Sequence, residues 1–193
     1  MISLAAQGIF WTVQGEGYFA GEPMIFIRTA GCSVGCETCD TNYRFHMELT
    51  EERIVEQCER LRDEHKRARY VWITGGEPTD QDLTALNKAL WGADFKPCLA
   101  TSGVRKVDGP WWWLSVSPHT TDFVQRSGAE LKLVPQLNGL QLDELNLDGL
   151  SFSYSYVQPM AGSKSSLDAC LAWLKDHHEY RMSPQNHKTW GLP

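Results

Sequence analysis

Short apolar runs recur along this chain, and amphipathic stretches separate the first of them. A continuous apolar run bounded by turn-forming residues is typical of a strand buried inside a sheet. Such runs predict strands at residues 24–29, 70–74, 97–101, 113–117, 131–134 and 152–157. Because helical patterns alternate with the first of these strands, we expect an α/β fold with mostly parallel strands.

Three stretches have the spacing of amphipathic helices. The first is expected to begin after Thr50, whose hydroxyl suits an N-cap, and its charged ends match the helix dipole. Those first-turn acids and last-turn bases are Glu51, Glu52, Lys66 and Arg67. The second helix is expected to start at Thr79, with Asp82 three residues later. Its apolar positions are Leu83, Leu86 and Leu90. The third helix covers about residues 165–177.

Helices become scarce after residue 101. In a complete parallel barrel a covering helix follows every strand, but the connections between residues 101 and 157 are mostly too short or too rich in Gly and Pro. We therefore expect one domain over residues 1–193, folded as an open, incomplete TIM-like α/β barrel with its site at the C-terminal ends of the strands. The irregular tail ends in Trp, Gly, Leu and Pro, so we expect it to dock onto the core.

The composition fits one globular domain and argues against two classes of partner. A chain of 193 residues with 42% hydrophobic residues can bury about 70% of its unfolded surface in a single core. Its formal net charge of −6 disfavours nonspecific nucleic-acid binding, and no stretch approaches the roughly 18 apolar residues of a membrane span. We expect a soluble protein of the reducing cytoplasm, with no direct nucleic-acid or membrane partner.

The run GCSVGCETCD holds three closely spaced cysteines in a C-x3-C-x2-C pattern: Cys32, Cys36 and Cys39. Three thiolates can hold three irons of a cubane cluster and leave the fourth iron without a protein ligand. An open iron can bind a small molecule and deliver an electron to it. The spacing therefore indicates chemistry rather than a structural role.

Two structural interpretations of the cysteine triplet are less favoured. A zinc site would need a fourth ligand, for which His46 is the nearest candidate, yet structural zinc sites usually draw on two separated pairs of ligands. Disulfides would leave one thiol of the triplet unpaired, and the N-terminus does not read as an export signal. The isolated cysteines are best interpreted as small buried hydrophobic residues: Cys58, Cys98 and Cys170.

Further chemically suggestive segments follow the predicted strands. TGGEP, residues 74–78, combines two glycines that let a ligand approach the backbone with Glu77, which can accept hydrogen bonds from an ammonium group. TSG at residues 101–103 and SPH at residues 117–119 offer hydroxyls suited to a ribose and a carboxylate. Because the ends of parallel strands meet at one edge, these segments are expected to share a site.

Together, GCSVGCETCD and TGGEP resemble the motifs of the radical S-adenosylmethionine superfamily. Within it, the chain is similar over nearly its whole length to the 7-carboxy-7-deazaguanine synthase family, from VQGEG through CDT and TGGEP to QPM and HKTWGLP. The resemblance implies a 4Fe-4S cluster, S-adenosyl-L-methionine (SAM) and Mg²⁺ as cofactors. It also implies a lyase reaction in which a 5'-deoxyadenosyl radical converts 6-carboxy-5,6,7,8-tetrahydropterin to 7-carboxy-7-deazaguanine with loss of ammonia, a step toward queuosine-type deazapurines.

The resemblance also implies roles for matching positions, although it singles out no catalytic side chain, because the radical performs the chemistry. The cluster ligands would be the triplet cysteines, and the Thr41 hydroxyl would ligate Mg²⁺ with Asp40 beside it. Substrate-binding positions would be Val13, Gln14, Gly15, Glu16, Arg28, Thr74, His187 and Pro193, the last two in a C-terminal lid at about residues 183–193. SAM-binding positions would be Gly76, Glu77, Thr101, Ser102, Ser117, Pro118, His119, Gln158, Pro159, Met160 and Ala161. In this family a lysine often stands where this chain has His119.

The resemblance further implies a homodimer and an electron donor such as flavodoxin. Two alternatives remain. One is another small radical SAM enzyme, such as a glycyl-radical enzyme activase, which would not need QGEG or a closing tail. The other is a zinc-binding interaction module, which metal analysis would reveal. The bulky PWWWL segment, residues 110–114, indicates a buried strand or a dimer surface.

Overall fold

The computed structural model describes residues 1–37, 39, 41–66 and 68–193. Within these residues nine strands form one sheet, in the order β3-β1-β2-β4-β5-β6-β7-β8-β9. β1 pairs antiparallel with β2 and β3. The remaining neighbours, in the order β2-β4-β5-β6-β7-β8-β9, pair in parallel. The strands are β1 (Ile2–Val13), β2 (Pro23–Thr29), β3 (Phe45–Leu49), β4 (Tyr70–Gly75), β5 (Lys96–Thr101), β6 (Trp113–Val116), β7 (Ser127–Leu133), β8 (Ser151–Val157) and β9 (Tyr180–Met182).

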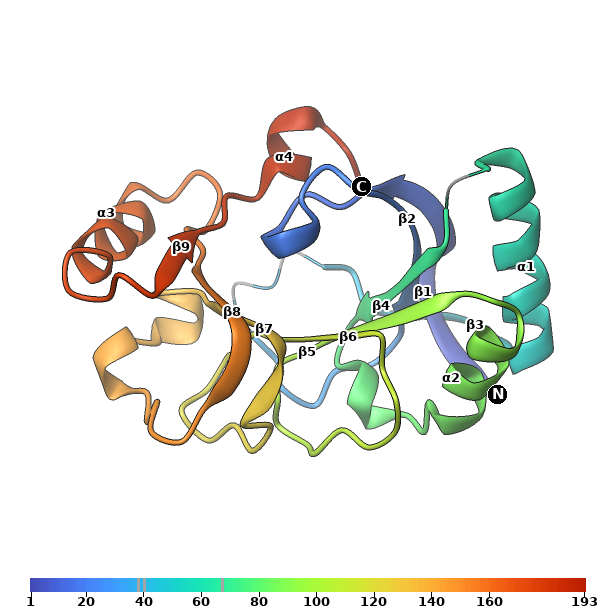
Figure 1. Ribbon diagram of the computed structural model, residues 1–193, viewed down its shortest axis with the longest axis horizontal. Helices are drawn as coiled ribbons and strands as arrows, with labels where there is room; N and C mark the ends of the chain where they lie inside the picture. The colour runs from blue at the N-terminus through green and yellow to red at the C-terminus, as the bar shows by residue number, and fades with distance from the viewer. Residues whose placement is uncertain (38, 40, 67) are drawn as a thin grey trace.

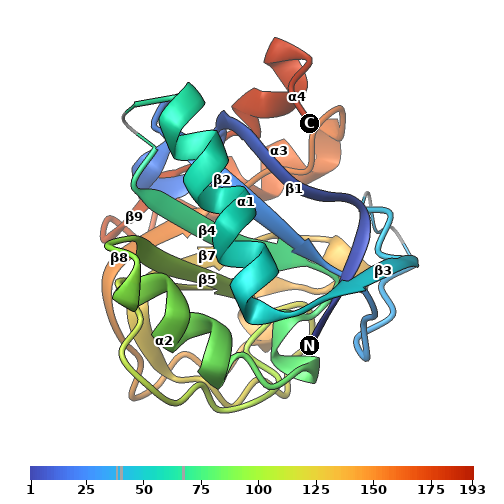
Figure 2. The same ribbon diagram turned by 90° about the vertical axis from the view of Figure 1, so that its right-hand side faces the viewer.

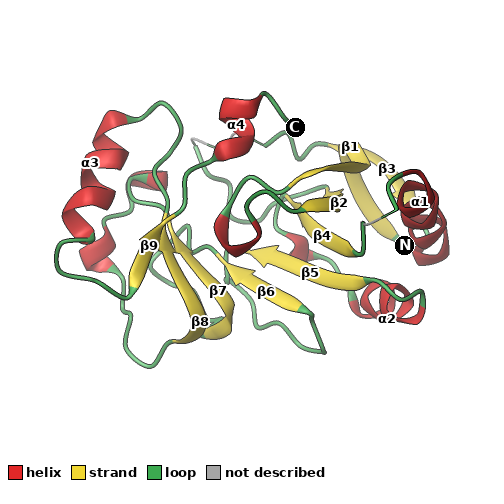
Figure 3. Cartoon of the chain, turned by 45° about the horizontal axis from the view of Figure 1, so that its top comes forward, coloured by secondary structure: helices red, strands yellow, loops and turns green. Residues whose placement is uncertain are grey.

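The sheet curves into an open barrel, with α1 and α2 outside one end and α3 outside the other (Figures 1 and 3). The helices are α1 (Glu51–Glu64), α2 (Thr84–Gly92), α3 (Lys164–Trp173) and α4 (Asn186–Trp190). Between β5 and β8 the helices are two short 3-10 turns, Leu137–Gly139 and Leu142–Glu144. The predicted incomplete α/β barrel with few helices in its second half is therefore confirmed.

Both faces of the central strands are buried, which explains their continuous apolar runs. Successive strand residues point to opposite faces, so Ile25 and Ile27 of β2 pack in the outer core with Ile54 of α1. Met24 and Phe26 face the inner side of the barrel, where they pack in a cluster with Trp72 and Cys98. Figure 2 shows α1 and α2 lying across the outer face of this part of the sheet.

The three isolated cysteines are fully buried, as predicted. Cys58 lies on α1 in the outer core, and Cys98 lies on β5 in the inner cluster. Cys170 lies on α3 in a separate cluster with Leu133 of β7 and Val157 of β8, called here the second outer core. Burial raises the pKa of the Cys58 thiol to about 12 and that of the Cys170 thiol to about 11. These thiols therefore stay protonated at neutral pH and act as small hydrophobic side chains.

The predicted N-cap of α1 is confirmed, but its predicted end is wrong. The Thr50 hydroxyl accepts a hydrogen bond from the Arg53 amide, with Glu51 and Glu52 in the first turn. The helix ends at Glu64, so Lys66 lies beyond it, and Arg67 lies outside the described residues. Arg62 instead supplies the positive charge of the last turn.

Two other helix boundaries differ from the pattern. Thr79 does not cap α2; it sits in a 3-10 turn, Pro78–Asp80, and α2 begins only at Thr84. The Thr79 hydroxyl donates to Glu77 instead, because that buried carboxylate competes for it. α3 ends at Trp173 rather than near residue 177. Beyond the end of the helix, the ring of His177 stacks on that of Trp173. The tail is less irregular than predicted, since it contains α4.

The apolar pattern missed three strands: the edge strands β3 and β9, and β1 beside β3. β1 is interrupted by Gly8, which has φ of 55°, and by a register shift against β2 between Leu4 and Ile9. β3 is almost entirely exposed, and β9 is only three residues long. The edge strands β3 and β9 lack the apolar runs that mark central strands, because edge positions bury less surface. In β1, which pairs on both sides, the interruption near Gly8 breaks the pattern.

The PWWWL segment is divided between environments. Trp113 begins β6 and its ring stacks on Tyr18 in the barrel interior, with 4.9 Å between ring centroids. Trp111 packs against the outer core, whereas Trp112 is 44% exposed. The prediction of a buried strand therefore holds for only part of the segment. Over the described ranges, the helices are too short or too polar to cross a membrane.

Candidate active site

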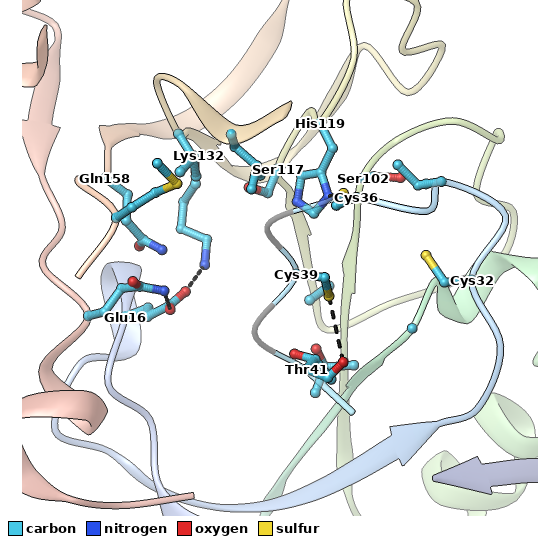
Figure 4. Close-up of a pocket in the computed structure, with 18 of the residues that line it drawn as sticks. Glu16, Cys32, Cys36, Cys39, Thr41, Ser102, Ser117, His119, Lys132 and Gln158 are labelled. Atoms are coloured by element: carbon cyan, nitrogen blue, oxygen red, sulfur yellow. Dashed lines mark hydrogen bonds and ion pairs between the residues drawn. The ribbon is translucent and has the colours of Figure 1, made fainter. Parts of the chain in front are cut away.

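One pocket, with a volume of about 590 Å³, lies at the C-terminal ends of the parallel strands (Figure 4). Loops that follow β2, β4, β5, β6, β7 and β8 all contribute to its wall. The predicted site residues that line it are Glu16, Cys32, Cys36, Cys39, Thr41, Thr74, Gly76, Glu77, Thr101, Ser102, Ser117, His119, Gln158, Met160 and Ala161. The fold thus gathers motifs that are far apart in the sequence into one chemical environment.

The remaining predicted positions are not part of the pocket wall. They are Val13, Gln14, Gly15, Arg28, Pro118, Pro159, His187 and Pro193. Arg28 lies on β2 directly opposite Thr74 in the parallel register, and its guanidinium lies 5.4 Å from the centre of the Phe10 ring. Asp40, expected beside a Mg²⁺ site, lies outside the described residues.

The cysteine loop is anchored at several points around the pocket. Asp80 accepts hydrogen bonds of 2.7 Å from both the amide and the hydroxyl of Ser33. The Glu37 amide donates to the side-chain oxygen of Asn138, in the turn after β7. These anchors join the loop to the segments that follow β4 and β7, so its thiols are held facing the pocket.

All six cysteines are free thiols, and the three of the triplet are partly accessible. Burial and the neighbouring Cys39 and Cys32 raise the pKa of the Cys36 thiol. The Sγ atom of Cys36 lies 3.2 Å from Nδ1 of His119. His119, which sequence similarity associates with SAM, is therefore placed against a cysteine of the triplet.

The three thiols of the triplet come from one short loop, unlike the two separated ligand pairs typical of a structural zinc site. Among the described side chains, no three His, Cys, Asp or Glu residues are arranged to hold one metal ion. Cysteines that bind separate irons of a cubane need not converge on one point, whereas zinc ligands must. His46, the possible fourth zinc ligand, lies on the exposed strand β3.

Glu77 joins the ends of β4 and β5. Its carboxylate is 1% exposed and accepts hydrogen bonds from the hydroxyls of Thr79 and Thr101 and from the Ser102 amide. The distances are 2.7, 2.7 and 2.8 Å. These contacts fix the wall of the pocket beside the cysteine loop.

Gly76 explains why TGGEP and the cysteine loop pack so closely. A Cβ atom at this position would lie 1.7 Å from the carbonyl oxygen of Gly31 and 3.2 Å from Cβ of Cys32. The Glu77 amide donates to the same Gly31 carbonyl at 3.0 Å. The backbone of TGGEP therefore lies directly against the start of the cysteine loop, and only glycine fits there.

Charged groups gather at the other end of the pocket, around Glu16 (Figure 4). The Lys132 ammonium donates a hydrogen bond to Oε2 of Glu16, and the Gln185 amide donates to Oε1 at 3.2 Å. Nδ1 of His187 lies 3.8 Å from Oε1. Burial opposes ionisation of Glu16, but the attraction of Lys132 outweighs it and lowers the pKa of Glu16 to about 2.

The C-terminal tail packs on the QGEG loop. The Asn186 amide donates to the Gly15 carbonyl at 3.1 Å, and the Gly17 amide donates to the Ser183 hydroxyl at 2.8 Å. A Cβ at Gly15 would lie 2.5 Å from the His187 amide nitrogen. The start of the tail thus contacts the QGEG loop, whereas the apolar end that was expected to dock onto the core is largely exposed, with Trp190 at 49%. Gln14 serves the loop internally by accepting from the Glu16 amide.

Several polar residues of this region were not predicted from the sequence: Tyr43, Glu130, Lys132, Gln185 and Lys188. All except Glu130 line the pocket, and Glu130 lies directly behind Lys132 on β7. A signal was present, because two charges at alternate positions of the apolar segment ELKLV must share one face of a strand. Buried charges of this kind usually have partners and often mark functional sites.

Comparisons with known proteins agree with this geometry. The model of the radical SAM superfamily matches residues 26–110. The 7-carboxy-7-deazaguanine synthase of Burkholderia multivorans is 34% identical over the whole of both chains, and that of Bradyrhizobium diazoefficiens is 34% identical over 99% of this chain and all of the relative. The crystal structure of QueE from Escherichia coli superposes with a TM-score of 0.71 at 27% identity, covering 95% of this chain and 93% of that one. The chain belongs to the 7-carboxy-7-deazaguanine synthase family of the radical SAM superfamily.

Proposed function

We propose that this protein converts 6-carboxy-5,6,7,8-tetrahydropterin to 7-carboxy-7-deazaguanine, with loss of ammonia, in the biosynthesis of queuosine-type 7-deazapurines. The observation that carries the proposal is the pocket itself. The cysteine loop forms one end of it, and the Glu16 carboxylate forms the other. A cluster held at the cysteine loop would generate the radical, and the Glu16 carboxylate could bind the N–H groups of a small polar heterocycle placed between the two ends.

The radical SAM family implies a 4Fe-4S cluster and SAM, and the pocket has residues to hold both. Cys32, Cys36 and Cys39 would ligate the cluster, with Gly76 and the strand ends at Thr101 and Ser117 beside SAM. When bound, cluster and SAM supply a carbon radical that removes a hydrogen atom from the substrate. The protein orients the substrate and excludes water, so that the radical meets the intended C–H bond.

The substrate end combines complementary hydrogen-bonding groups. The ionised Glu16 can accept hydrogen bonds from the adjacent N–H groups of an aminopyrimidinone ring, and Gln14 supports the backbone from which Glu16 projects. Arg28 is not in the pocket wall but lies on β2 opposite the pocket residue Thr74, and we propose that its guanidinium reaches the substrate carboxylate in a forked pair. We propose that the tail, residues 183–193 with His187 and Pro193, forms a lid over this end.

A direct assay tests the function. Anaerobically reconstituted protein supplied with SAM, Mg²⁺, a reductant and the carboxytetrahydropterin should form 7-carboxy-7-deazaguanine, detected by mass spectrometry. Formation of 5'-deoxyadenosine without the deazaguanine product would reject the assignment. A glycyl-radical enzyme activase would instead require a protein substrate.

We propose that Mg²⁺ binds at Thr41 and bridges to the substrate carboxylate. Thr41 lines the pocket, and its carbonyl accepts a hydrogen bond from the Cys39 thiol at 3.6 Å. One protein oxygen is a small ligand set, but Mg²⁺ commonly keeps several waters and shares substrate oxygens.

Thr41→Ala is expected to spare the cluster and weaken the Mg²⁺ dependence of the reaction, because it removes only the side-chain oxygen. The rate is measured against Mg²⁺ concentration, with iron content as the check on the cluster. Thr41→Ser keeps the hydroxyl and serves as the matched control. An unchanged response to Mg²⁺ in Thr41→Ala would remove this residue from the metal site.

We further propose that the enzyme works as a homodimer in the reducing cytoplasm and receives electrons from a separate protein such as flavodoxin. Cys39 is exposed, so a cluster at this loop would lie within reach of a docked electron-donor protein.

A candidate surface for the contact between subunits is the aromatic pair of Trp91 and Trp112. Both side chains are partly exposed, and their ring centroids lie 6.2 Å apart.

A further inference from the structure

The Glu16 carboxylate is supported by a second pair of charged residues on β7. Glu130 and Lys132 are two residues apart on the same strand face, and both are buried. The Lys132 side chain is 9% exposed and that of Glu16 is 16% exposed, so their ion pair is largely shielded from water. A buried ammonium of this kind is costly unless it is paired.

Glu130 is itself held rigidly. Its carboxylate accepts hydrogen bonds from the Ser115 hydroxyl at 2.9 Å and from the Tyr18 amide at 2.8 Å. Tyr18 belongs to the 3-10 turn that follows QGEG, so Glu130 contacts the same loop that carries Glu16. A Cβ at Gly17 would lie 2.4 Å from both Glu130 oxygens. The QGEG loop is therefore fixed on β7 from two sides.

We propose that Lys132, supported by Glu130, is a positioning residue that holds Glu16 ionised and directed at the substrate end of the pocket. This inference rests on the proposed role of Glu16 in pterin binding. Burial lowers the pKa of Lys132, but the negative charges of Glu16 and Glu130 outweigh burial and raise it. The ammonium group therefore stays protonated. Lys132 in turn leaves Glu16 as an acceptor at neutral pH.

The charges that face Glu16 come from two elements packed against it. Lys132 lies on β7, with Glu130 behind it, and His187 lies on α4. Gln158 and Gln185 contribute neutral hydrogen bonds. Without Lys132, burial would be the dominant influence and would raise the pKa of Glu16, against the smaller opposing contributions of His187 and Gln158.

The experiment is a double-mutant cycle on the reconstituted holoenzyme, with Glu16→Gln, Lys132→Met and the double variant. Lys132→Met should raise the KM for the pterin about tenfold or more with little change in kcat, because a charge-assisted contact used for binding is weakened. The ratio of its KM to that of the parent should grow as pH falls from 9 to 6, since protonated Glu16 cannot accept. Using this ratio cancels titration of the substrate itself.

In the Glu16→Gln background the Lys132→Met change should have almost no further effect on KM, because Lys132 acts through Glu16. The double variant removes both charges of the pair, so neither Glu16 nor Lys132 is left there as a buried charge without its partner. Lys132→Arg keeps the positive charge, so it should bind the pterin almost as tightly as the parent. The ratio of its KM to that of the parent should stay constant between pH 9 and 6.

The inference would be overturned if the effects of Glu16→Gln and Lys132→Met on KM were additive, or if the ratio of the Lys132→Met KM to the parent KM did not depend on pH. Either result would leave the proposed function standing. A parent protein that forms no deazaguanine product would overturn the proposed function and the inference with it. A Glu16→Gln variant with an unchanged pterin KM would overturn the role assigned to both residues.

Discussion

Cys36→Ala is expected to abolish cluster assembly and, with it, all conversion of the pterin. The two remaining cysteines of the loop can ligate only two irons of a cubane, which leaves the iron that Cys36 would hold without its thiolate. Iron and sulfide per chain should fall to background after anaerobic reconstitution. The electron paramagnetic resonance signal of the reduced protein, and its change on addition of SAM, should disappear.

Cys170→Ala is the matched control for loss of a thiol. Cys170 is fully buried on α3 in the second outer core, and it does not line the pocket. Its replacement should cost roughly 1 kcal/mol of folding stability and leave the iron content unchanged. A Cys36→Ala protein that still bound four irons per chain would contradict the assignment of the triplet.

Gly76→Ala is expected to have the second largest effect, through the backbone rather than through any lost functional group. The new methyl group would lie 1.7 Å from the Gly31 carbonyl oxygen, far inside contact distance, so TGGEP and the cysteine loop would have to separate. Overpacking against rigid backbone costs about 3 kcal/mol or more. The loss should be visible in chemical denaturation, and SAM binding should weaken because both segments line the same pocket.

Gly92→Ala provides the control for a glycine-to-alanine change. Gly92 ends α2, and a Cβ there would meet no atom within 4 Å. Alanine favours helix over glycine by up to about 1 kcal/mol, so this variant should be as stable as the parent or slightly more stable. Equal stability of Gly76→Ala and the parent protein would show that the close packing of the two loops is not required.

Prediction from the sequence succeeded where burial leaves a strong local pattern. The central strands are buried on both faces, so their apolar runs were found within a few residues. It failed for β1 and β3, because a bulge at Gly8 and an exposed edge break the pattern. It also failed at Thr79, whose hydroxyl donates to the nearby carboxylate of Glu77, a group held in place by contacts with the distant residues Thr101 and Ser102.

The candidate site divides in the same way. Short motifs with distinctive spacing, the cysteine triplet and TGGEP, were recognisable because neighbouring residues must act together. Lys132 was not recognised, although it pairs with Glu16, because the two residues belong to segments more than a hundred positions apart. Nothing in the local sequence around Glu16 indicates which strand supplies its counter-charge.

By itself, the sequence determined the class of fold, the family and the residues that can ligate a cluster, since each depends on local periodicity or on spacing within one loop. Only the tertiary structure decided that His119 faces Cys36, that Glu77 is satisfied by the end of β5, and that Glu16 is charged beside Lys132. Those contacts arise because the curvature of the sheet brings the ends of distant strands to one pocket. The strength of a buried charge depends on neighbours that only folding assembles.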